Sequence, residues 1–127
     1  MKPQNRHSDL IFYSREHHHT LTLCLHVLRN PTSNHQQEIE AHRPDLLHHF
    51  QQEEIQFKPL WQKLPISFRQ RFEQDHTVLR QLLTKPDYTN SDWNNCFASS
   101  LRDHIRFEER ELFPAIERCV STSEKSY

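Results

Sequence analysis

One short motif, a histidine followed four residues later by a glutamate, occurs twice in this chain and could carry its chemistry. The two copies run from His49 to Glu53 and from His104 to Glu108. Four residues are about one turn of an α-helix, so both side chains of a copy leave the same helix face and can hold one metal ion. The flanks also match, since each histidine follows a leucine by three residues and precedes a proline by ten. Two such turns in one chain predict a paired site for two metal ions.

Two further histidines, outside the repeated motif, complete the predicted site. His18 and His76 each stand on a helical segment that precedes one copy of the motif, and leucines follow both at the same offsets. This match favours His18, with the adjacent His17 as the alternative ligand or as a residue that orients a ligand. Glu54 and Glu109 directly follow the motif glutamates, and we expect them to be exposed. The predicted metal ligands are therefore His18, His49, Glu53, His76, His104 and Glu108.

Prolines and polar clusters divide the chain into four helical segments that would position these side chains. We expect helices at about residues 8–30, 33–63, 65–84 and 91–120, the last with Ser91 as its N-cap. Pro44 is expected to kink or split the second helix. The tail, residues 121–127, is expected to be disordered.

Apolar residues recur at spacings of three and four along each segment, and a histidine interrupts each apolar stripe. The spacing assigns the stripe of the first helix to Ile11, Ser14, His18, Leu21, Leu25 and Leu28. Four histidines and two glutamates would thus lie where packing favours leucine, and burying them without partners would cost several kcal/mol each. Metal coordination would satisfy all six together. The sequence predicts an all-α, up-down-up-down four-helix bundle built from two αα-hairpins related by a pseudo-twofold axis.

Composition excludes several other classes of protein. The 127 residues suit one domain, with a core at about 8–118, and the absence of glycine argues against an all-β fold or a phosphate-binding loop. Sixteen basic and seventeen acidic residues leave no basic surface for nucleic acid or an anionic membrane. Three unpaired cysteines and a polar N-terminus predict a cytoplasmic protein with reduced thiols.

The predicted ligand set indicates the metal. Imidazole and carboxylate without thiolate suit iron, manganese or zinc. A structural zinc site needs only four ligands and usually uses cysteine. Six ligands from four helices are better matched to two irons bridged by Glu53 and Glu108, with a position left open for a small diatomic molecule, peroxide or water. Manganese and zinc are the less favoured metals.

Four segments of the chain resemble the hemerythrin-like (HHE cation-binding) family. They are Ser-Arg-Glu-His-His-His at 14–19, His-Phe-Gln-Gln-Glu-Glu at 49–54, Asp-His-Thr-Val-Leu at 75–79, and Asp-His-Ile-Arg-Phe-Glu-Glu at 103–109. The resemblance covers about residues 8–118 and implies a four-helix bundle with a non-haem di-iron centre. Oxygen-carrying members of the family have a second histidine one turn after the third-helix ligand, where this chain has Arg80. This departure implies a closer relation to the members that act in repair and redox stress.

Three functional hypotheses follow from the site and the resemblance. The first is a di-iron protein that binds O₂, NO or peroxide, in iron homeostasis or in the response to oxidative or nitrosative stress. The second is a redox enzyme that reduces peroxide or NO or repairs iron centres, with Glu109, Arg80 and Tyr13 as candidate proton donors. The third is a metal-free or zinc-bound helical module that binds another protein.

Overall fold

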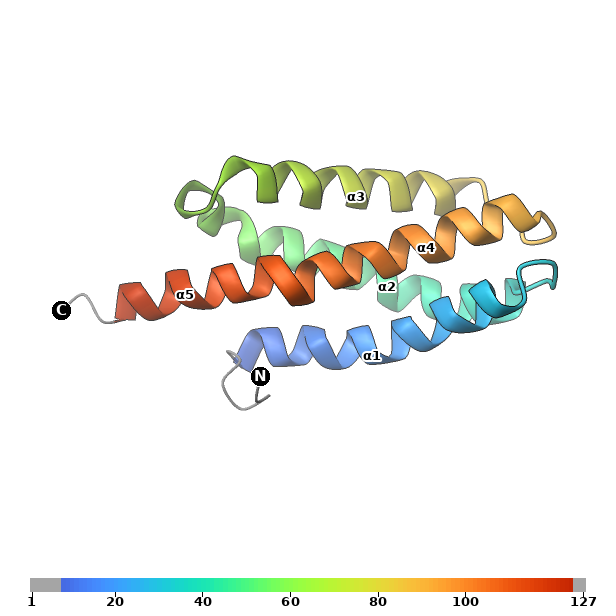
Figure 1. The fold of residues 1–127 in the computed structure, drawn as a ribbon, viewed down its shortest axis with the longest axis horizontal. Coiled ribbons are helices and arrows are strands. Elements are labelled where there is room, and N and C mark those ends of the chain that lie inside the picture. The colour runs from blue at the N-terminus through green and yellow to red at the C-terminus, as the bar shows by residue number, and fades with distance from the viewer. Residues whose placement is uncertain (1–7, 125–127) are drawn as a thin grey trace.

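This computed structural model describes residues 8–124, which are mostly helical, with short loops at 30–35, 64–65 and 85–90. No β-strand occurs in that part, which confirms the all-α prediction. Figure 1 shows a four-helix bundle, in which α4, η3 and α5 follow one another to form the last long helical segment. The elements are α1 (Ser8–Arg29), α2 (Gln36–Phe57), the 3₁₀ helix η2 (Lys58–Lys63), α3 (Ile66–Thr84), α4 (Ser91–Phe107), the π-helical turn η3 (Glu108–Leu112) and α5 (Phe113–Glu124).

The helix boundaries follow the prolines and one asparagine cap. Pro44 lies inside α2 without ending it, whereas the α-helix does end just before Pro59, which stands at the start of η2. Proline has no N–H to continue the α-helical hydrogen bonds, which explains the change to a 3₁₀ helix there. At the start of α4 the N-cap is Asn90 and not Ser91, because the Asn90 side chain accepts hydrogen bonds from two backbone N–H groups of the first turn.

The C-terminal helix is longer than the sequence predicted. We expected it to end at about residue 120, but α5 continues to Glu124. Residues 121–124, which we expected to be disordered, are therefore helical. The rest of the predicted disordered tail, residues 125–127, lies outside the described residues.

Two apolar clusters form the core, one toward each end of the bundle. The first contains Leu23, Cys24, Val27, Ile39, Leu46, Phe50, Leu79, Leu83, Phe97, Ala98, Leu101 and Ile105. The second contains Leu10, Tyr13, Phe57, Trp61, Phe72, Phe107, Leu112, Phe113 and Ile116. Between the two clusters, each of the four long helical segments has at least one buried histidine, and the second and fourth also have a buried glutamate. The fold is thus stabilised by apolar packing on both sides of a polar layer.

The buried face of α1 differs from the predicted stripe by one residue. The prediction placed His18 and Leu25 inside, but His18 is exposed and Leu25 is 44 % exposed. The buried residues of α1 are instead Leu10, Tyr13, His17, Leu23, Cys24 and Val27. One residue corresponds to a helix rotation of about 100°. The aromatic ring of Tyr13 fixes this rotation, because it packs against rings of α2 and α5 in the core.

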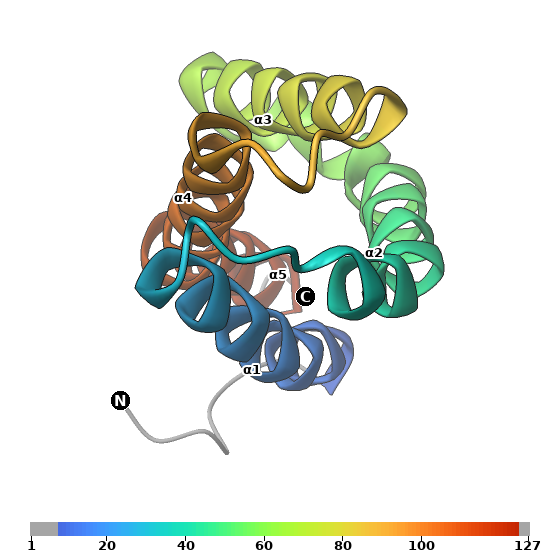
Figure 2. The same cartoon turned by 90° about the vertical axis from the view of Figure 1, so that its right-hand side faces the viewer.

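All four long helical segments border a common central axis. Figure 2 shows α1 and α3 on opposite sides of this axis, with α2 and α4 on the other two sides. Each segment can therefore contribute side chains to one central site. No helix within residues 8–124 has both the length and the apolar content needed to cross a bilayer.

Candidate metal centre

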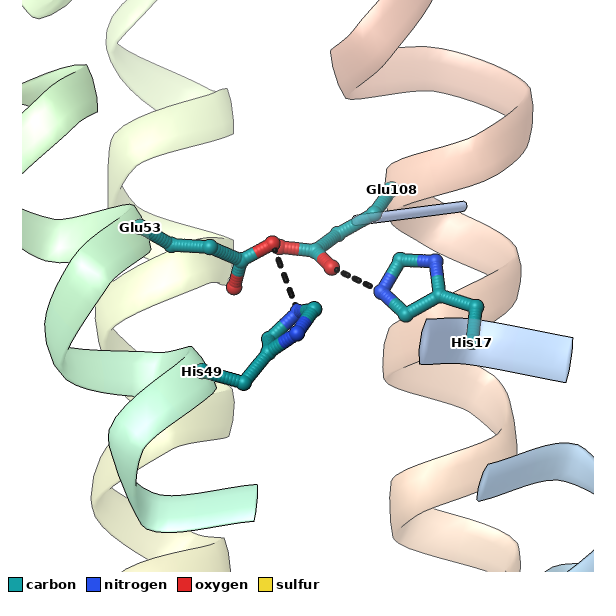
Figure 3. Close-up of side chains that lie close together, drawn as sticks. All are labelled: His17, His49, Glu53 and Glu108. Atoms are coloured by element: carbon teal, nitrogen blue, oxygen red, sulfur yellow. Dashed lines mark ion pairs between the residues drawn. The ribbon is translucent and has the colours of Figure 1, made fainter. Parts of the chain in front are cut away.

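Four histidines and two glutamates meet in the polar layer between the apolar clusters. The histidines are His17 of α1, His49 of α2, His76 of α3 and His104 of α4; the glutamates are Glu53 of α2 and Glu108 of η3. Both glutamates are 0 % exposed, and no histidine of the set exceeds 6 %. Figure 3 shows His17, His49 and the two carboxylates turned toward one another from three separate segments. Such complete burial of six polar side chains requires a compensating partner.

The six side chains form two overlapping groups whose ligand atoms lie close enough together to hold a metal ion. One group contains His17, His49, Glu53 and Glu108; the other contains Glu53, His76, His104 and Glu108. Within each group, one ligand atom per residue lies within 4.8 Å of all the others. Both glutamates belong to both groups, so the two histidine pairs lie on either side of a shared pair of carboxylates. This arrangement could hold a metal ion.

The inward-facing atom of every histidine is Nε2. His17 Nε2 lies 2.9 Å from Glu108 Oε1, and His104 Nε2 lies 3.3 Å from the other oxygen of that carboxylate. His49 Nε2 and His76 Nε2 lie 3.1 and 3.4 Å from the two oxygens of Glu53. Each carboxylate therefore directs one oxygen toward each of the two groups, so both glutamates could contribute a ligand atom to either group.

The outward-facing nitrogen of every histidine, Nδ1, donates a hydrogen bond to a further carboxylate. The four pairs are His17 with Glu109 at 2.6 Å, His49 with Glu16 at 2.7 Å, His76 with Glu54 at 2.8 Å, and His104 with Asp75 at 2.9 Å. An ionised carboxylate only accepts hydrogen bonds, so these contacts place a proton on Nδ1 and leave Nε2 for coordination. Metal-binding histidines are held and made more basic by this kind of contact.

The outer carboxylates obey the same pseudo-twofold relation as the inner groups. Glu16 and Asp75 each stand directly before a site histidine and bind the histidine of the next long helix. Glu54 and Glu109 each stand directly after a shared glutamate and bind a histidine of the other half of the chain. Exchanging the two halves therefore reproduces the whole network. This regularity distinguishes a built site from a chance cluster of polar residues.

The structure brings together five of the six predicted residues and replaces the sixth. The prediction chose His18 on α1, but His18 is exposed and His17 takes the position inside the bundle. The physical reason is the rotation of α1 that Tyr13 fixes. A sequence signal pointed to His17, because an acidic residue directly precedes both His17 and His76.

Sequence reasoning also misjudged the glutamate that directly follows each copy of the motif. Glu54 and Glu109 were expected on the exposed face, yet both are partly buried and bind site histidines. Their partners lie 22 and 92 residues away in the sequence. Local helix periodicity carries no information on contacts at such separations.

The π-helical turn at Glu108–Leu112 was also missed, and it contributes to the site. The backbone N–H of Phe113 bonds to the carbonyl of Glu108, five residues earlier, instead of the four of an α-helix. This inserted residue lets both Leu112 and Phe113 face the core. The Phe113 ring then stacks on His17, with a centroid distance of 5.6 Å and an interplanar angle of 10°. Such turns are frequent at functional sites in helical proteins.

The charges of the centre are strongly perturbed by burial and by one another. Burial raises the pKa of Glu53 well above its ordinary value, and the charge of Glu108 adds to this effect. Burial would also raise the pKa of Glu108, but His104 and His17 hold it well below the ordinary value. Ionising both of these adjacent carboxylates is therefore energetically unfavourable unless additional positive charge is present.

The pKa values of the site histidines are shifted in different directions. Burial and the positive charge of His104 lower the pKa of His76 to about 4. Burial would lower the pKa of His104 too, but the charge of Glu108 and the hydrogen bond to Asp75 raise it to about 10. Burial would lower the pKa of His17, but the adjacent charge of Glu108 and the hydrogen bond to Glu109 raise it to about 8. In the metal-free protein, protons thus supply charge that metal ions can replace, so metal binding would release them.

Orphaned polar atoms provide a direct test of whether these residues fit a metal. Five buried atoms of the centre have no hydrogen-bond partner: His49 Nε2 and all four carboxylate oxygens of Glu53 and Glu108. The nearby histidine nitrogens are close to these oxygens but poorly directed for hydrogen bonding. All five atoms are lone-pair donors of the kind that iron, manganese and zinc accept. The donor set therefore fits a metal ion.

A small cavity adjoins the centre on the side of His17, His49 and His104. It measures about 10 Å³, and apolar side chains form most of the remaining wall: Leu46, Phe50, Leu101 and Ile105. A cavity of this size has room for about one water-sized molecule. It could admit a very small ligand but no organic substrate.

Comparison with known proteins found no match to this chain among family models, curated proteins or solved structures. The buried histidine and glutamate groups, which could hold a metal ion, are therefore the basis on which a function can be inferred.

Proposed function

We propose that this chain is a hemerythrin-like protein, an up-down-up-down four-helix bundle that holds two irons and binds O₂, NO or peroxide. We further propose that it serves iron homeostasis or the response to oxidative or nitrosative stress. The observation that carries the proposal is the paired geometry of the centre. Two histidine pairs face a shared pair of carboxylates, and every histidine is oriented by an outer carboxylate.

The side chains have distinct roles in this proposal. His17 and His49 would hold one metal ion, His76 and His104 the second, and Glu53 and Glu108 would contact both. Bound iron would supply redox chemistry and a coordination position for a small ligand. The outer carboxylates fix the imidazole rings before metal arrives, which lowers the cost of ordering the site.

The donor set and the number of groups favour iron over the alternatives. Each metal position has two imidazoles and two shared carboxylates, which is a harder donor set than that of thiolate-rich structural zinc sites. Di-iron proteins built on four-helix bundles use inward-facing carboxylates and histidines of this kind. Manganese or zinc could occupy the same donors, so the metal must be measured.

The size of the adjoining cavity supports a very small ligand. About 10 Å³ beside three of the histidines accommodates roughly one molecule of the size of water. The wall is mostly apolar, which favours an uncharged ligand such as O₂ or NO over an ionic one. Binding and catalysis at this centre would be distinguished by turnover in the presence of a reductant, as opposed to saturable binding alone.

The test is metal content in a matched pair of variants. Protein expressed with added iron should contain about two irons per chain by elemental analysis and show the charge-transfer absorption of a ferric pair. His17→Ala should lose most of this iron, whereas His18→Ala, one residue away and exposed, should keep it. Iron-free wild-type protein, or equal loss in both variants, would refute the proposal.

A further inference from the structure

The two metal positions have different surroundings, although their inner ligands are equivalent. On the α3/α4 side, both outer carboxylates are bound by arginine. Arg80 binds both oxygens of Glu54, at 2.5 and 3.0 Å, and Arg71 Nε binds Asp75 at 2.8 Å. These carboxylates are the acceptors for His76 and His104.

On the α1/α2 side, the carboxylate behind His49 has no such partner. Glu16 accepts the hydrogen bond of His49 Nδ1 at 2.7 Å, and no arginine or lysine within residues 8–124 binds its carboxylate. The pseudo-twofold relation explains the difference in residue types. The positions on α1 that correspond to Arg71 and Arg80 are occupied by Phe12 and Leu21.

An arginine behind an outer carboxylate weakens the histidine in front of it. A carboxylate makes an imidazole more basic by accepting its Nδ1 proton in a hydrogen bond. An arginine that binds the same carboxylate compensates part of its negative charge, so the carboxylate accepts less strongly and the imidazole donates less electron density through Nε2. The two guanidinium groups also bring positive charge toward that metal position, which further disfavours a cation.

We propose that the arginines make the two metal positions unequal, so that the His17/His49 position binds metal more tightly and fills first. The His76/His104 position fills second and releases its metal first. Arg71 and Arg80 are positioning residues that act through Asp75 and Glu54. The inference rests on the proposed function, since it presupposes that both positions take a metal ion.

Two variants that each retain one complete position allow a direct comparison. His104→Ala leaves the His17/His49 position, and His49→Ala leaves the His76/His104 position. Cobalt(II), whose visible absorption reports coordination, is the probe for both. We expect His104→Ala to bind cobalt about tenfold more tightly than His49→Ala, within the range that outer contacts contribute to metal affinity.

Removing the arginine charges should abolish this difference in cobalt affinity between the two variants. Arg71→Gln combined with Arg80→Gln keeps a hydrogen-bond donor at each position but removes the charge. These changes should strengthen cobalt binding by His49→Ala several-fold and leave His104→Ala unaffected. Arg69→Gln is the matched control, because Arg69 lies on the same helix and pairs with the exposed Glu73, which contacts no histidine. High salt should also reduce the difference in cobalt affinity, since both arginine side chains are 40–43 % exposed and salt screens their charge.

The outcomes separate this inference from the proposed function. If a single histidine substitution unfolds the protein, stepwise cobalt titration of the otherwise unchanged chain replaces the comparison, and the Arg71→Gln/Arg80→Gln variant should then bind its second cobalt more tightly. Equal affinities of the two positions, or an unchanged second step in that variant, would overturn the inference and leave a two-metal centre standing. A wild-type chain that binds no cobalt would refute both the inference and the proposed function.

Discussion

Replacing Glu53 by leucine should stabilise the metal-free protein while removing its ability to bind metal. Glu53 is completely buried, and neither of its carboxylate oxygens has a hydrogen-bond partner. Each unsatisfied buried polar group costs about 1–3 kcal/mol, and replacing buried ionisable groups with apolar ones of similar size often stabilises a protein by about 1–4 kcal/mol. We expect a gain of about 2–3 kcal/mol for Glu53→Leu without metal. For a chain of this size the melting temperature should rise by roughly 10 °C.

The assay is thermal and urea unfolding, followed by circular dichroism at 222 nm, in a metal chelator and then with added iron or cobalt. Gln52→Leu, on the exposed face of the same helix, controls for the helix propensity of leucine. With metal present, the wild-type protein should be more stable than Glu53→Leu. A ligand at about a thousand times its dissociation constant stabilises the native state by about 4 kcal/mol, and only proteins that retain the centre gain this.

The result that would refute this reasoning is a Glu53→Leu protein that is less stable than wild type in chelator. It would mean that the carboxyl group already has a satisfactory partner in the metal-free state. The orphaned oxygens would then no longer indicate a metal site. A variant that is more stable in chelator and unaffected by metal would support the site.

Three further predictions concern other parts of the network and the core. Glu109→Gln should lower metal affinity by about 10–100-fold by weakening the hydrogen bond that orients His17, without loss of helical content, as measured by competition with a chelator. Asn94→Leu should destabilise the protein by about 2–4 kcal/mol in urea unfolding, because the buried Asn94 amide donates to backbone carbonyls of both loops at that end of the bundle. In native protein at pH 8, Cys96 should react with a thiol reagent and Cys24 should not, because burial raises the pKa of Cys24 to about 12 while Cys96 is exposed; rapid labelling of both would contradict the packing of α1.

The residues that sequence reasoning placed in the site are those that repeat. His49, Glu53, His104 and Glu108 form two copies of one pattern, and a helix repeats its face every three to four residues, so spacing alone put each pair on one side of its helix. The lone His76 followed from its place in the second half of the pseudo-symmetric chain. The all-α architecture followed from the same periodicity and from the absence of glycine.

The first helix could not be settled in this way, because three consecutive histidines and leucines on several faces permit more than one rotation. Its rotation is decided by Tyr13, whose ring packs at 5.0 Å from the His49 ring and 5.9 Å from the Phe57 ring. Both partners belong to another helix. The sequence carried a hint in the acidic residue before His17 and His76, but its meaning depends on contacts between helices.

The outer carboxylates explain how a small bundle tolerates so polar a centre. Glu16, Glu54, Glu109 and Asp75 are all partly exposed, with side-chain exposures between 20 and 36 %, so water solvates part of their charge. They satisfy the Nδ1 atom of each histidine at the border between core and surface, where charge costs less. The cost that remains is concentrated on the inner oxygens of Glu53 and Glu108, which neither water nor any donor reaches. The Nδ1 atom of each histidine thus has a hydrogen-bond acceptor, whereas the carboxylate oxygens at the centre have no donor. This is the arrangement expected of a site whose inner atoms bind metal.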